Sequence, residues 1–569
     1  MISYKFSINN PASQYIQIEM TFESNQDIEH IQLPSWRPGR YELGNFAKNV
    51  KNFKVFGEDR KPLCFNKITK DCWKIETDGN KKIHISYSYY AVDLNAGSTF
   101  LDKNQLYVNP VNCCVFIVGK ELEKCEINLD IPNSYEIACG LKSANNILFA
   151  ENFDQLADSP FICSASLQHD TYTANETIFH LWFQGQVIVD WEKIKTDFLK
   201  FTAKQIEKFS EFPVPEYHFF FQIVPVKAYH GVEHQTSTVI LLGPSYDIFQ
   251  GFYKELLGVS SHELYHTWNV KSIRPIEMFP YDFTKENYSK LGYLCEGVTT
   301  YMGDLFLLKS GVFSEKEYFL ELNNQLQKHF DNFARFNYSV ADSSFDTWLD
   351  GYISGAPNRK VSIYTEGCLL AFATDVFIMK NSKEKYNLDD LMKRLYFDFY
   401  LNGKGVSEKD YQEKVEQLAN ASFQGLLDDY FYGTNPFESL IVDAFEYLGL
   451  ELVHKPSPKY SFAKLGFKSL PAGQNFIVKA IYPGSPAEMG DLMLEDEIIA
   501  VNSYLCNGEL DKWLHHFDDE IKLLSVMRSG KLIEVCFPTA VRNFYLDYSV
   551  KKNENPNQHQ KKAFERWIR

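Results

Sequence analysis

The residues most able to do chemistry in this chain lie in the sequence HELYH at 262–266. On a helix, residues four apart share one face, so His262 and His266 can both reach one Zn²⁺. Zinc lowers the pKa of a bound water to about 7, and the carboxylate of Glu263 can take the proton of that water as it attacks a carbonyl. The preceding LLGVSS at 256–261 fits a helix, as the site requires. The alternative is two core histidines on an ordinary helix.

A catalytic zinc needs a third protein ligand and one open position, so we expect an acidic residue on a second helix. The candidates downstream are Glu277, Glu286 and Glu296. The first two flank a stretch with Pro, Asp and Asn that is typical of a loop. Glu296 lies in LCEGVTTYMGD at 294–304, which indicates the start of a helix. We therefore predict Glu296 as the third ligand.

The sequence HELYHTWNVKSIRP at 262–275 resembles the zinc helix of the glycyl aminopeptidase family, whose members carry a PDZ domain. These enzymes are gluzincins, related in fold to thermolysin and to the alanyl aminopeptidases. The EG pair at 296–297, with Thr299 and Tyr301, is similar to the third-ligand helix of the family. The loop PSWRPGRY at 34–41 and the C-terminal region are also similar. The resemblance covers nearly the whole chain and implies a zinc aminopeptidase.

A further acidic residue lies in GVEH at 231–234. In the related aminopeptidases the Glu of a Gly-x-x-Glu motif holds the free α-amine of the substrate, so the resemblance implies substrate-binding roles for Glu233 and Gly231. The role is physically reasonable, because an ammonium in a closed cleft needs a carboxylate partner. This chain has His230 in place of the first glycine that is usual in the family. The alternative is an edge-strand glutamate paired with a surface lysine.

The sequence SIYTEGCL at 362–369 resembles the Tyr-x-Lys-Gly segment that opens a helix in the family. In the relatives this phenol hydrogen-bonds the oxyanion, and one good donor of this kind contributes about 3–4 kcal/mol. The resemblance therefore implies that Tyr364 stabilises the oxyanion. This chain has Glu366 where Lys is common, and the neighbouring Tyr352 is a competitor for the role.

The C-terminal region from 464 to 502 is similar to a PDZ domain, with a helix start at GSPA (484–487) between two strand-like segments. PDZ grooves bind peptides by strand addition, and their backbone N–H groups capture a terminal carboxylate. The resemblance places the carboxylate loop at Leu465, Gly466 and Phe467. The alternative is a unit that serves only as a packing brace.

The predicted secondary structure that must position these residues changes from strands to helices along the chain. Apolar and polar residues alternate at 15–22 and 82–90, which predicts β structure over about the first 170 residues. Helical spacing at 189–209 and long helical runs from 251 to 444 indicate a mostly α middle region, with a short strand at 218–224. We therefore expect the zinc ligands on helices.

The loop at 34–41 interrupts the strand pattern. Two prolines and a glycine around Trp36 and Arg37 predict a rigid loop. Such a loop is either a packed turn or a segment that reaches the active site.

Together these patterns predict a multidomain α+β protein with an N-terminal antiparallel β-sandwich, a thermolysin-like, mostly α catalytic domain and a C-terminal PDZ domain. The predicted boundaries are 1–170 for the β-sandwich, 171–456 for the catalytic domain, 457–541 for the PDZ domain and 542–569 for a C-terminal tail.

Composition narrows the class of protein. The chain has 569 residues, which is enough for three or four domains at about 100–200 residues each. A net charge of −16 disfavours a nucleic-acid partner. No secretory signal is visible, and no apolar stretch approaches the ~20 residues that cross a bilayer. Eleven cysteines without framework spacing favour reduced thiols in a cytoplasm, or in a periplasm if a leader has been removed.

These observations predict a zinc aminopeptidase that binds one Zn²⁺ per chain and acts on peptides with a free N-terminus. A preference for N-terminal Gly or Ala is implied by the resemblance. A zinc endopeptidase would use the same site without needing Glu233. A non-catalytic PDZ scaffold with a vestigial zinc site is a third hypothesis, which the intact set of ligands and base disfavours.

Overall fold

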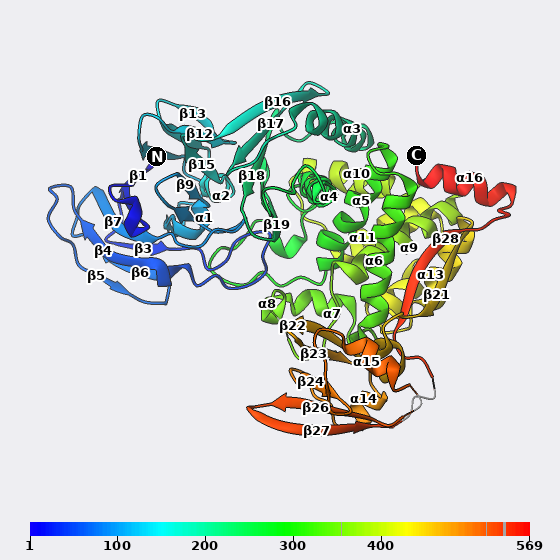
Figure 1. Ribbon diagram of the computed structural model, residues 1–569. Coiled ribbons are helices and arrows are strands. Elements are labelled where there is room, and N and C mark those ends of the chain that lie inside the picture. The colour runs from blue at the N-terminus through cyan, green and yellow to red at the C-terminus, as the bar shows by residue number, and fades with distance from the viewer. Residues whose placement is uncertain (354, 519, 539–541) are drawn as a thin grey trace. The chain divides into compact units, whose positions relative to one another are not determined.

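The computed structural model describes residues 1–353, 355–518, 520–538 and 542–569 (Figure 1). Within this part of the chain, residue contacts divide the protein into two compact units. The first unit comprises Met1–Tyr318, Asn332–Leu448 and Gln558–Arg569, and the second comprises Phe319–Asp331 and Gly449–Asn557.

The N-terminal part of the first unit is β-rich. In β2 (Tyr15–Glu23) every second side chain is buried, as the alternating sequence predicts. The described strands form three sheets around a common apolar core. The first sheet runs, in order, β13 (Lys142–Ala144), β14 (Ile147–Ala150), β11 (Cys125–Asp130), β1 (Ile2–Ser7), β2, β7 (Lys82–Tyr90) and β4 (Val50–Phe56). The second runs β10 (Phe116–Ile117), β3 (Ile28–Gln32), β6 (Cys72–Glu76) and β5 (Phe65–Lys67), and the third runs β12 (Glu136–Cys139), β15 (Phe161–Ser164), β9 (Gln105–Val108) and β8 (Phe100–Leu101).

The prediction of an antiparallel β-sandwich is wrong for one central pair of strands. β1 and β11 are parallel, with Ile2 opposite Cys125 and Ser7 opposite Asp130. A period-two pattern is the same for both strand directions, so the sequence pattern does not distinguish them. The long connection between these two strands leaves either direction open to the chain.

A five-stranded sheet in the first unit leads from the β-rich part to the helices. Its order is β16 (Gln168–Ala174), β17 (Thr177–Gln184), β18 (Glu216–Ile223), β20 (Ser237–Gly243) and β19 (Ala228–Glu233). β17, β18 and β20 are parallel, and the two outer strands are antiparallel to their neighbours. The sequence predicts the β18 strand in its helical middle region. β19 packs against α4 (Tyr253–Tyr265), which brings a strand end close to the zinc motif (Figure 1).

Helices make up most of the rest of the first unit. α9 (Thr365–Ser382) is apolar around most of its circumference and is almost wholly buried, which is typical of a central helix. The remaining helices with their bounds are α1 (Pro110–Cys113), α2 (Phe153–Ala157), α3 (Trp191–Phe209), α5 (Thr299–Lys309), α7 (Val340–Phe345), α8 (Thr347–Asp350), α10 (Leu388–Asp398), α11 (Glu408–Ala419), α12 (Gln424–Leu426), α13 (Glu438–Tyr447) and α16 (Gln558–Trp567). The boundary between the units falls inside α6 (Glu315–Asp331).

The second unit is built mainly from strands. β21 (Leu450–Pro456) pairs with β28 (Leu546–Lys552), a strand within the region that the sequence predicts as a tail. The other sheet has its own apolar core. Its strands are β22 (Phe467–Ala472), β23 (Asn475–Ile481), β24 (Glu497–Val501), β25 (Tyr504–Leu505), β26 (Lys522–Arg528) and β27 (Lys531–Phe537), with the short helices α14 (Pro486–Met489) and α15 (Leu510–His516).

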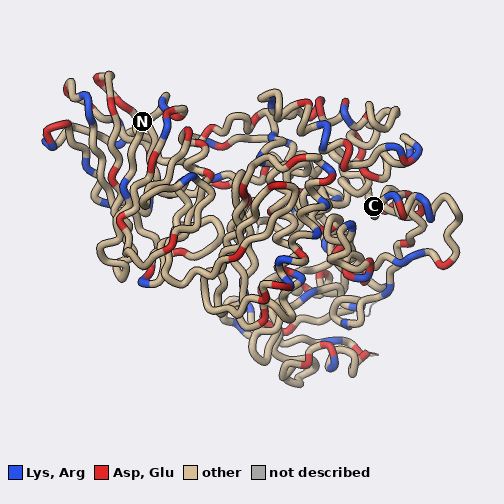
Figure 2. Tube along the Cα trace, turned by 90° about the horizontal axis from the view of Figure 1, so that it is seen from above, with Lys and Arg blue, Asp and Glu red and all other residues tan. Residues whose placement is uncertain are grey.

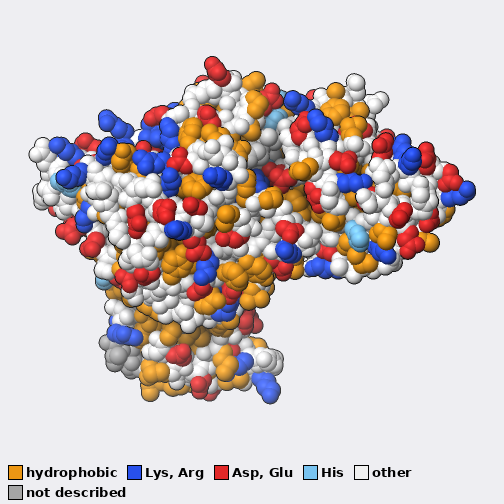
Figure 3. All heavy atoms as spheres, turned by 180° about the vertical axis from the view of Figure 1, so that it is seen from behind, with side chains coloured by type: hydrophobic (Ala, Val, Ile, Leu, Met, Phe, Trp, Pro, Cys, Tyr) orange, Lys and Arg blue, Asp and Glu red, His pale blue; other side chains and the backbone are white. Residues whose placement is uncertain are grey.

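Charged residues of both signs are distributed along the described chain (Figure 2). On the face seen in Figure 3 they are interspersed with apolar side chains. Among the helices of the described residues, none combines the length and the apolar character that a membrane span requires.

Candidate active site

The HELYH motif lies at the C-terminal end of α4, with His266 directly after the last helical residue. Buried hydrogen bonds fix this helix to its neighbours. The side chain of Gln205 on α3 donates to the carbonyl of Ser261 over 3.0 Å, and the hydroxyl of Ser261 donates to the carbonyl of Gly303 on α5 over 2.7 Å. The position of His262 is therefore set by α3 and α5 as well as by α4.

The ring of His266 is oriented by the turn that follows α4. Its Nδ1 lies 2.7 Å from the carbonyl oxygen of Asn269. A carbonyl only accepts, so Nδ1 carries a proton and Nε2 is the nitrogen that is left to bind a metal ion. The side-chain amide of Asn269 donates to the carbonyl of Leu294 over 2.8 Å and to the hydroxyl of Thr299 over 3.0 Å. Asn269 therefore links the zinc helix to the segment that carries Glu296.

Glu296 lies in η4 (Tyr293–Val298), a π-helical turn directly before α5. Such turns are frequent at functional sites. Its Oε2 lies 3.4 Å from Nε2 of His266 and 3.8 Å from Nε2 of His262, and the two Nε2 atoms lie 3.0 Å apart. Ligand atoms around a tetrahedral zinc are about 3.3 Å apart, given bonds of about 2 Å. We call His262, His266 and Glu296 the helix cluster; its donor types and spacing fit a zinc ion.

The helix cluster is buried among carboxylates. Burial lowers the pKa of His262 well below its ordinary value, and His266 adds to this shift. Burial also raises the pKa of Glu263 well above its ordinary value, with repulsion from Glu233 and Glu296. For His266 burial lowers the pKa, but Glu233 and Glu296 outweigh it and raise the pKa to about 10. The site therefore has the excess negative charge that a bound cation would neutralise.

The carboxylate of Glu263 packs against β19. A side chain at Gly231 would collide with its Oε1, so only glycine lets the strand approach this closely. Glu263 is buried, and among the described residues its Oε2 has no hydrogen-bond partner. Buried polar atoms normally have one, so this oxygen is directed at a ligand or a water molecule.

Glu233 is the last residue of β19 and is also buried. Its Oε1 has no hydrogen-bond partner in the described part of the chain. Ligand atoms of Glu233, Glu263 and His266 all lie within 4.8 Å of one another. The structure thus brings the predicted amine-binding carboxylate beside the predicted base.

The loop at 34–41 is both a packed turn and a contact of this site. Trp36 is fully buried and donates its indole N–H to a backbone carbonyl of the catalytic region over 2.7 Å. Gly39 has a φ of +78°, and a Cβ there would lie 2.5 Å from Oε2 of Glu233. Burial lowers the pKa of Arg37, and the nearby Glu233 carboxylate opposes that shift. The β-rich part therefore supplies one wall of the site.

Asp158 binds the two residues that follow β19. Its Oδ1 accepts from Nζ of Lys271 over 2.7 Å and lies 3.1 Å from Nδ1 of His234, and its Oδ2 accepts from the backbone N–H of Gln235 over 2.8 Å. Burial alone would raise the pKa of Asp158, but Lys271 and His234 outweigh it and hold the pKa below its usual range. The residue after Glu233 is thereby tied to the segment after α4.

Tyr364 caps the start of α9 and is half-buried at the side of Glu296. Burial raises the pKa of Tyr364 well above its ordinary value, and the carboxylate of Glu296 and the neighbouring Tyr352 add to this. Its hydroxyl also interacts with the Glu296 carboxylate. The Tyr352 hydroxyl accepts from the backbone N–H of Tyr41 over 3.2 Å. The structure thus places Tyr364 at the helix cluster and holds Tyr352 beside the loop.

The three residues of the predicted carboxylate loop lie in the second unit. Leu465 ends η8 (Ser461–Leu465), and Phe467 begins β22; both side chains belong to the apolar core. The N–H of Gly466 donates to the carbonyl of Ser461, and its own carbonyl accepts from Tyr482 over 2.7 Å. In this conformation the Gly466 amide is engaged within the unit.

Sequence reasoning missed Asn269, Asp158 and the contact of Gly39 with Glu233. A general signal exists for Asn269, because a ligand histidine usually donates its second ring N–H to a nearby carbonyl or carboxylate. Asp158 lies 113 residues before Lys271, and no local pattern connects them. The contact of Gly39 likewise depends on the tertiary fold.

Two family models match the chain. Residues 3–165 match the Peptidase M61 N-terminal domain, and residues 255–370 match M61 glycyl aminopeptidase. The second match contains the whole helix cluster together with Glu263 and Tyr364. A comparison with curated proteins gives no significant match.

Among solved structures, the chain is similar to an aminopeptidase N family protein from Idiomarina loihiensis, with a TM-score of 0.93, 24% identity and 100% of both chains covered. This likeness supports the fold. An M1 zinc metallopeptidase from Deinococcus radiodurans also matches, with a TM-score of 0.47, 12% identity and coverage of 76% of this chain and 94% of that chain.

Proposed function

Because the chain belongs to the M61 glycyl aminopeptidase family, we propose that it is a zinc-dependent aminopeptidase that removes N-terminal Gly or Ala from peptides. The observation that carries the proposal is the helix cluster with two carboxylate oxygens beside it that have no hydrogen-bond partner among the described residues. These oxygens belong to Glu263 and Glu233. One is placed to move a proton, and the other to hold a positive charge.

We assign one catalytic zinc ion per chain to His262, His266 and Glu296. When bound, zinc acts as a Lewis acid that polarises the scissile carbonyl and lowers the pKa of a water molecule. The role of Asn269 is to keep the His266 ring in the tautomer that has a free Nε2.

Glu263 acts as the general base. Its carboxylate takes a proton from the attacking water and later delivers it to the nitrogen of the leaving amine. The free Oε2 supports this role, since it has no competing partner in the described chain. Gly231 lets the β19 backbone approach this carboxylate directly, so the strand forms a wall of the site beside the base.

Glu233 binds the free α-amine of the substrate. A buried ammonium needs a carboxylate partner, and the Oε1 of Glu233 is available for one. The wall formed by Gly39 and Arg37 fixes this carboxylate and limits the space beyond it. This arrangement favours an exopeptidase with a small first residue.

Tyr364 donates its hydroxyl hydrogen to the oxyanion that develops on the carbonyl oxygen. Burial keeps the phenol protonated, as a donor must be. Tyr352 is bound by the Tyr41 backbone and supports Tyr364 from the side of the loop.

The test compares glycyl-, alanyl- and leucyl-anilides with their N-acetylated forms, with and without a chelator. We expect hydrolysis of the free glycyl and alanyl substrates only, and its loss when zinc is removed. In Glu233→Gln the KM for the free substrate should rise about tenfold or more, because a buried charge pair is lost. Equal hydrolysis of the acetylated substrates would favour the endopeptidase. No hydrolysis by the zinc-loaded protein would favour the scaffold.

For the second unit we propose a PDZ domain that binds peptide C-termini at Leu465, Gly466 and Phe467. Its order of strands and short helices supports the assignment, with β22 as an edge strand for strand addition. Binding would require the Gly466 amide to exchange its bond to Ser461. Titration of the full chain with labelled peptides, free or amidated at the C-terminus, tests this; only the free acids should bind.

A cytoplasmic location of the protein stays a prediction.

A further inference from the structure

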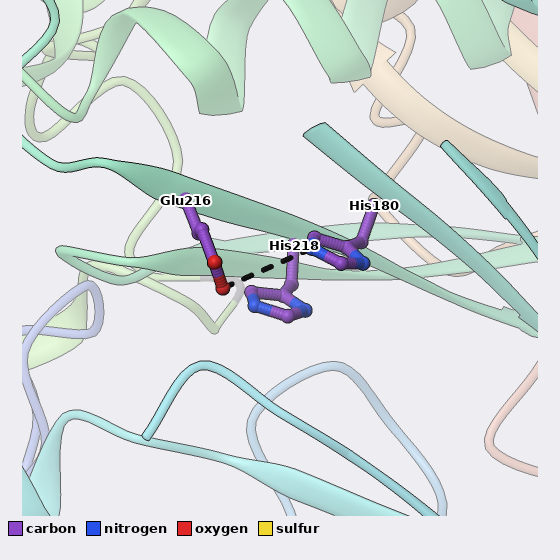
Figure 4. A group of neighbouring side chains, drawn as sticks. All are labelled: His180, Glu216 and His218. Atoms are coloured by element: carbon purple, nitrogen blue, oxygen red, sulfur yellow. Dashed lines mark ion pairs between the residues drawn. The ribbon is translucent and has the colours of Figure 1, made fainter. Parts of the chain in front are cut away.

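A second group of two histidines and one glutamate lies on the five-stranded sheet of the first unit. His180 stands on β17, and Glu216 and His218 stand on β18 (Figure 4). One ligand atom from each lies within 4.8 Å of the others. We call these three residues the sheet cluster. The reaction proposed above does not use it.

Strand geometry brings these side chains together. Residues two apart on a strand share a face, so Glu216 and His218 point the same way. His180 is directly opposite His218 in the parallel pairing of β17 with β18. The two rings stack with centroids 4.3 Å apart and planes 7° apart. Figure 4 shows the Glu216 carboxylate directed at the ring nitrogen of His180, with the His218 ring beside it.

His180 has the arrangement of a ligand imidazole. Its Nδ1 lies 3.0 Å from Nε2 of His169 on β16, so a neighbouring ring can fix its tautomer. Its Nε2 is shielded from solvent, lies 3.9 Å from Oε2 of Glu216 and has no hydrogen-bond partner in the described part of the chain. An imidazole nitrogen and a carboxylate that face each other at this distance leave a place for a cation between them when the nitrogen is deprotonated.

His218 is constrained by Trp182. The indole N–H of Trp182 donates to Nδ1 of His218 over 3.1 Å. In neutral His218 the proton then sits on Nε2, so an ion bound there must shift that proton and release the indole. This exchange lowers the metal affinity by roughly fivefold. It also makes Trp182 a reporter of binding.

We propose that His180, Glu216 and His218 form a second metal site for a divalent ion that accepts mixed nitrogen and oxygen ligands, such as Zn²⁺. Two imidazoles and one carboxylate are a ligand set of this class. Glu216 is 57% exposed, so the ion can enter from solvent without opening the core. The site joins β17 to β18.

The test is equilibrium dialysis of the zinc-loaded protein against buffered free Zn²⁺, with metal content read by atomic emission. We expect two zinc ions per chain for the parent, and one for His180→Gln and for His218→Gln. Glu216→Gln changes an exposed side chain, so it should fold normally and bind the second ion about tenfold more weakly. His30→Gln removes an exposed histidine elsewhere on the first unit and should still bind two.

A second readout identifies the place of binding. Trp182→Phe removes the competing hydrogen bond, so it should bind the second ion roughly fivefold more tightly. It should also lose most of the change in tryptophan fluorescence that accompanies binding in the parent. One ion per chain at saturation, or a second ion kept by His180→Gln and His218→Gln, would overturn the proposal. Either result would leave the aminopeptidase proposal intact, because that proposal is read from anilide hydrolysis.

Discussion

The helix cluster and the sheet cluster use the same residue types on different scaffolds. In the helix cluster, two histidines four apart at the C-terminal end of α4 meet a glutamate from η4, and His266 and Glu296 are almost fully buried. In the sheet cluster, the ligands are a cross-strand pair and a residue two positions away, and one of them is largely exposed. The ligands of the helix cluster are brought together mainly by the period of a helix, and those of the sheet cluster by the pairing of two strands.

The two clusters also differ in the residues that surround them. Buried charge needs compensation, and the helix cluster is embedded in a network that includes Asp158, Lys271 and Asn269. Two further carboxylates, Glu233 and Glu263, lie within reach of His266. The ligands of the sheet cluster contact the rings of His169 and Trp182 instead, which orient them through Nε2 of His169 and the indole N–H of Trp182. We therefore expect catalysis at the first cluster and metal binding alone at the second.

The largest expected effect separates catalysis from metal binding. Glu263→Gln should lower kcat by about a thousandfold, because it removes the proton acceptor from the attacking water. Both metal sites should remain loaded, since Glu263 is not a ligand of either. The measurement is glycyl-anilide turnover together with zinc content per chain.

Glu216→Gln is the matched control, because it makes the same chemical change at the other cluster. It should leave turnover unchanged. Normal turnover by the zinc-loaded Glu263→Gln variant would contradict the mechanism, and loss of turnover in Glu216→Gln would contradict the separation of the two clusters.

The contrast also explains what could be predicted from the sequence. The pair His262 and His266 is visible because helix spacing is local, and Glu296 is found because it opens the next helix. The resemblance to the glycyl aminopeptidase family is confirmed by the two matched models. The sheet cluster is invisible at this level, since His180 and His218 are 38 positions apart and meet only through strand register.

For the fold, too, the sequence pattern reveals local structure but not which strands pair. The alternating pattern correctly predicts a β-rich N-terminal part, but not that β1 and β11 are parallel. The strand β18 reads HFFFQI over its last residues and is buried along most of its length, so its sequence has little alternation. Its partners β17 and β20 are set by tertiary pairing, which the sequence pattern of β18 does not reveal.

The next effect concerns the buried charge network of Asp158, Lys271 and His234, which joins the segments that follow β19 and α4 near the helix cluster. In Asp158→Asn the buried ammonium of Lys271 loses its partner, which should lower the free energy of unfolding at neutral pH by about 3–5 kcal/mol. The folded-state pKa of Asp158 lies below its unfolded value. Its contribution is therefore complete above pH ~4 and is lost as the pH falls through the folded pKa.

Denaturant unfolding of the parent and of Asp158→Asn at a series of pH values checks this. The difference between the two should be largest near neutral pH and should shrink in acid. Asp130→Asn is the control, since Asp130 is exposed and its pair with Lys5 lies at the surface, where little change is expected. A constant difference between Asp158→Asn and the parent down to pH 2 would show that the carboxylate charge is not the cause.

A smaller effect tests how each cluster orients its histidine. Asn269→Ala removes the amide that fixes the turn after α4, so His266 loses a rigid acceptor for its Nδ1. Zinc affinity at the helix cluster should fall about 10–100-fold, the usual cost of losing an orienting partner. Competition with a chromogenic chelator measures it. Asn381→Ala, an exposed position on α9, should have no effect, and an unchanged affinity in Asn269→Ala would remove Asn269 from the site.

The smallest effect is the corresponding change at the sheet cluster. His169→Phe keeps an aromatic ring at the position that stacks on Trp182, with centroids 3.6 Å apart, but removes the nitrogen that lies 3.0 Å from Nδ1 of His180 and that we expect to accept from it. The second zinc should bind about tenfold more weakly, because His180 is then free to place its proton on Nε2. The helix cluster should keep its zinc and its turnover. An unchanged second affinity would mean that His169 donates to His180 instead of accepting, and the two clusters would then differ in how their histidines are oriented as well as in scaffold.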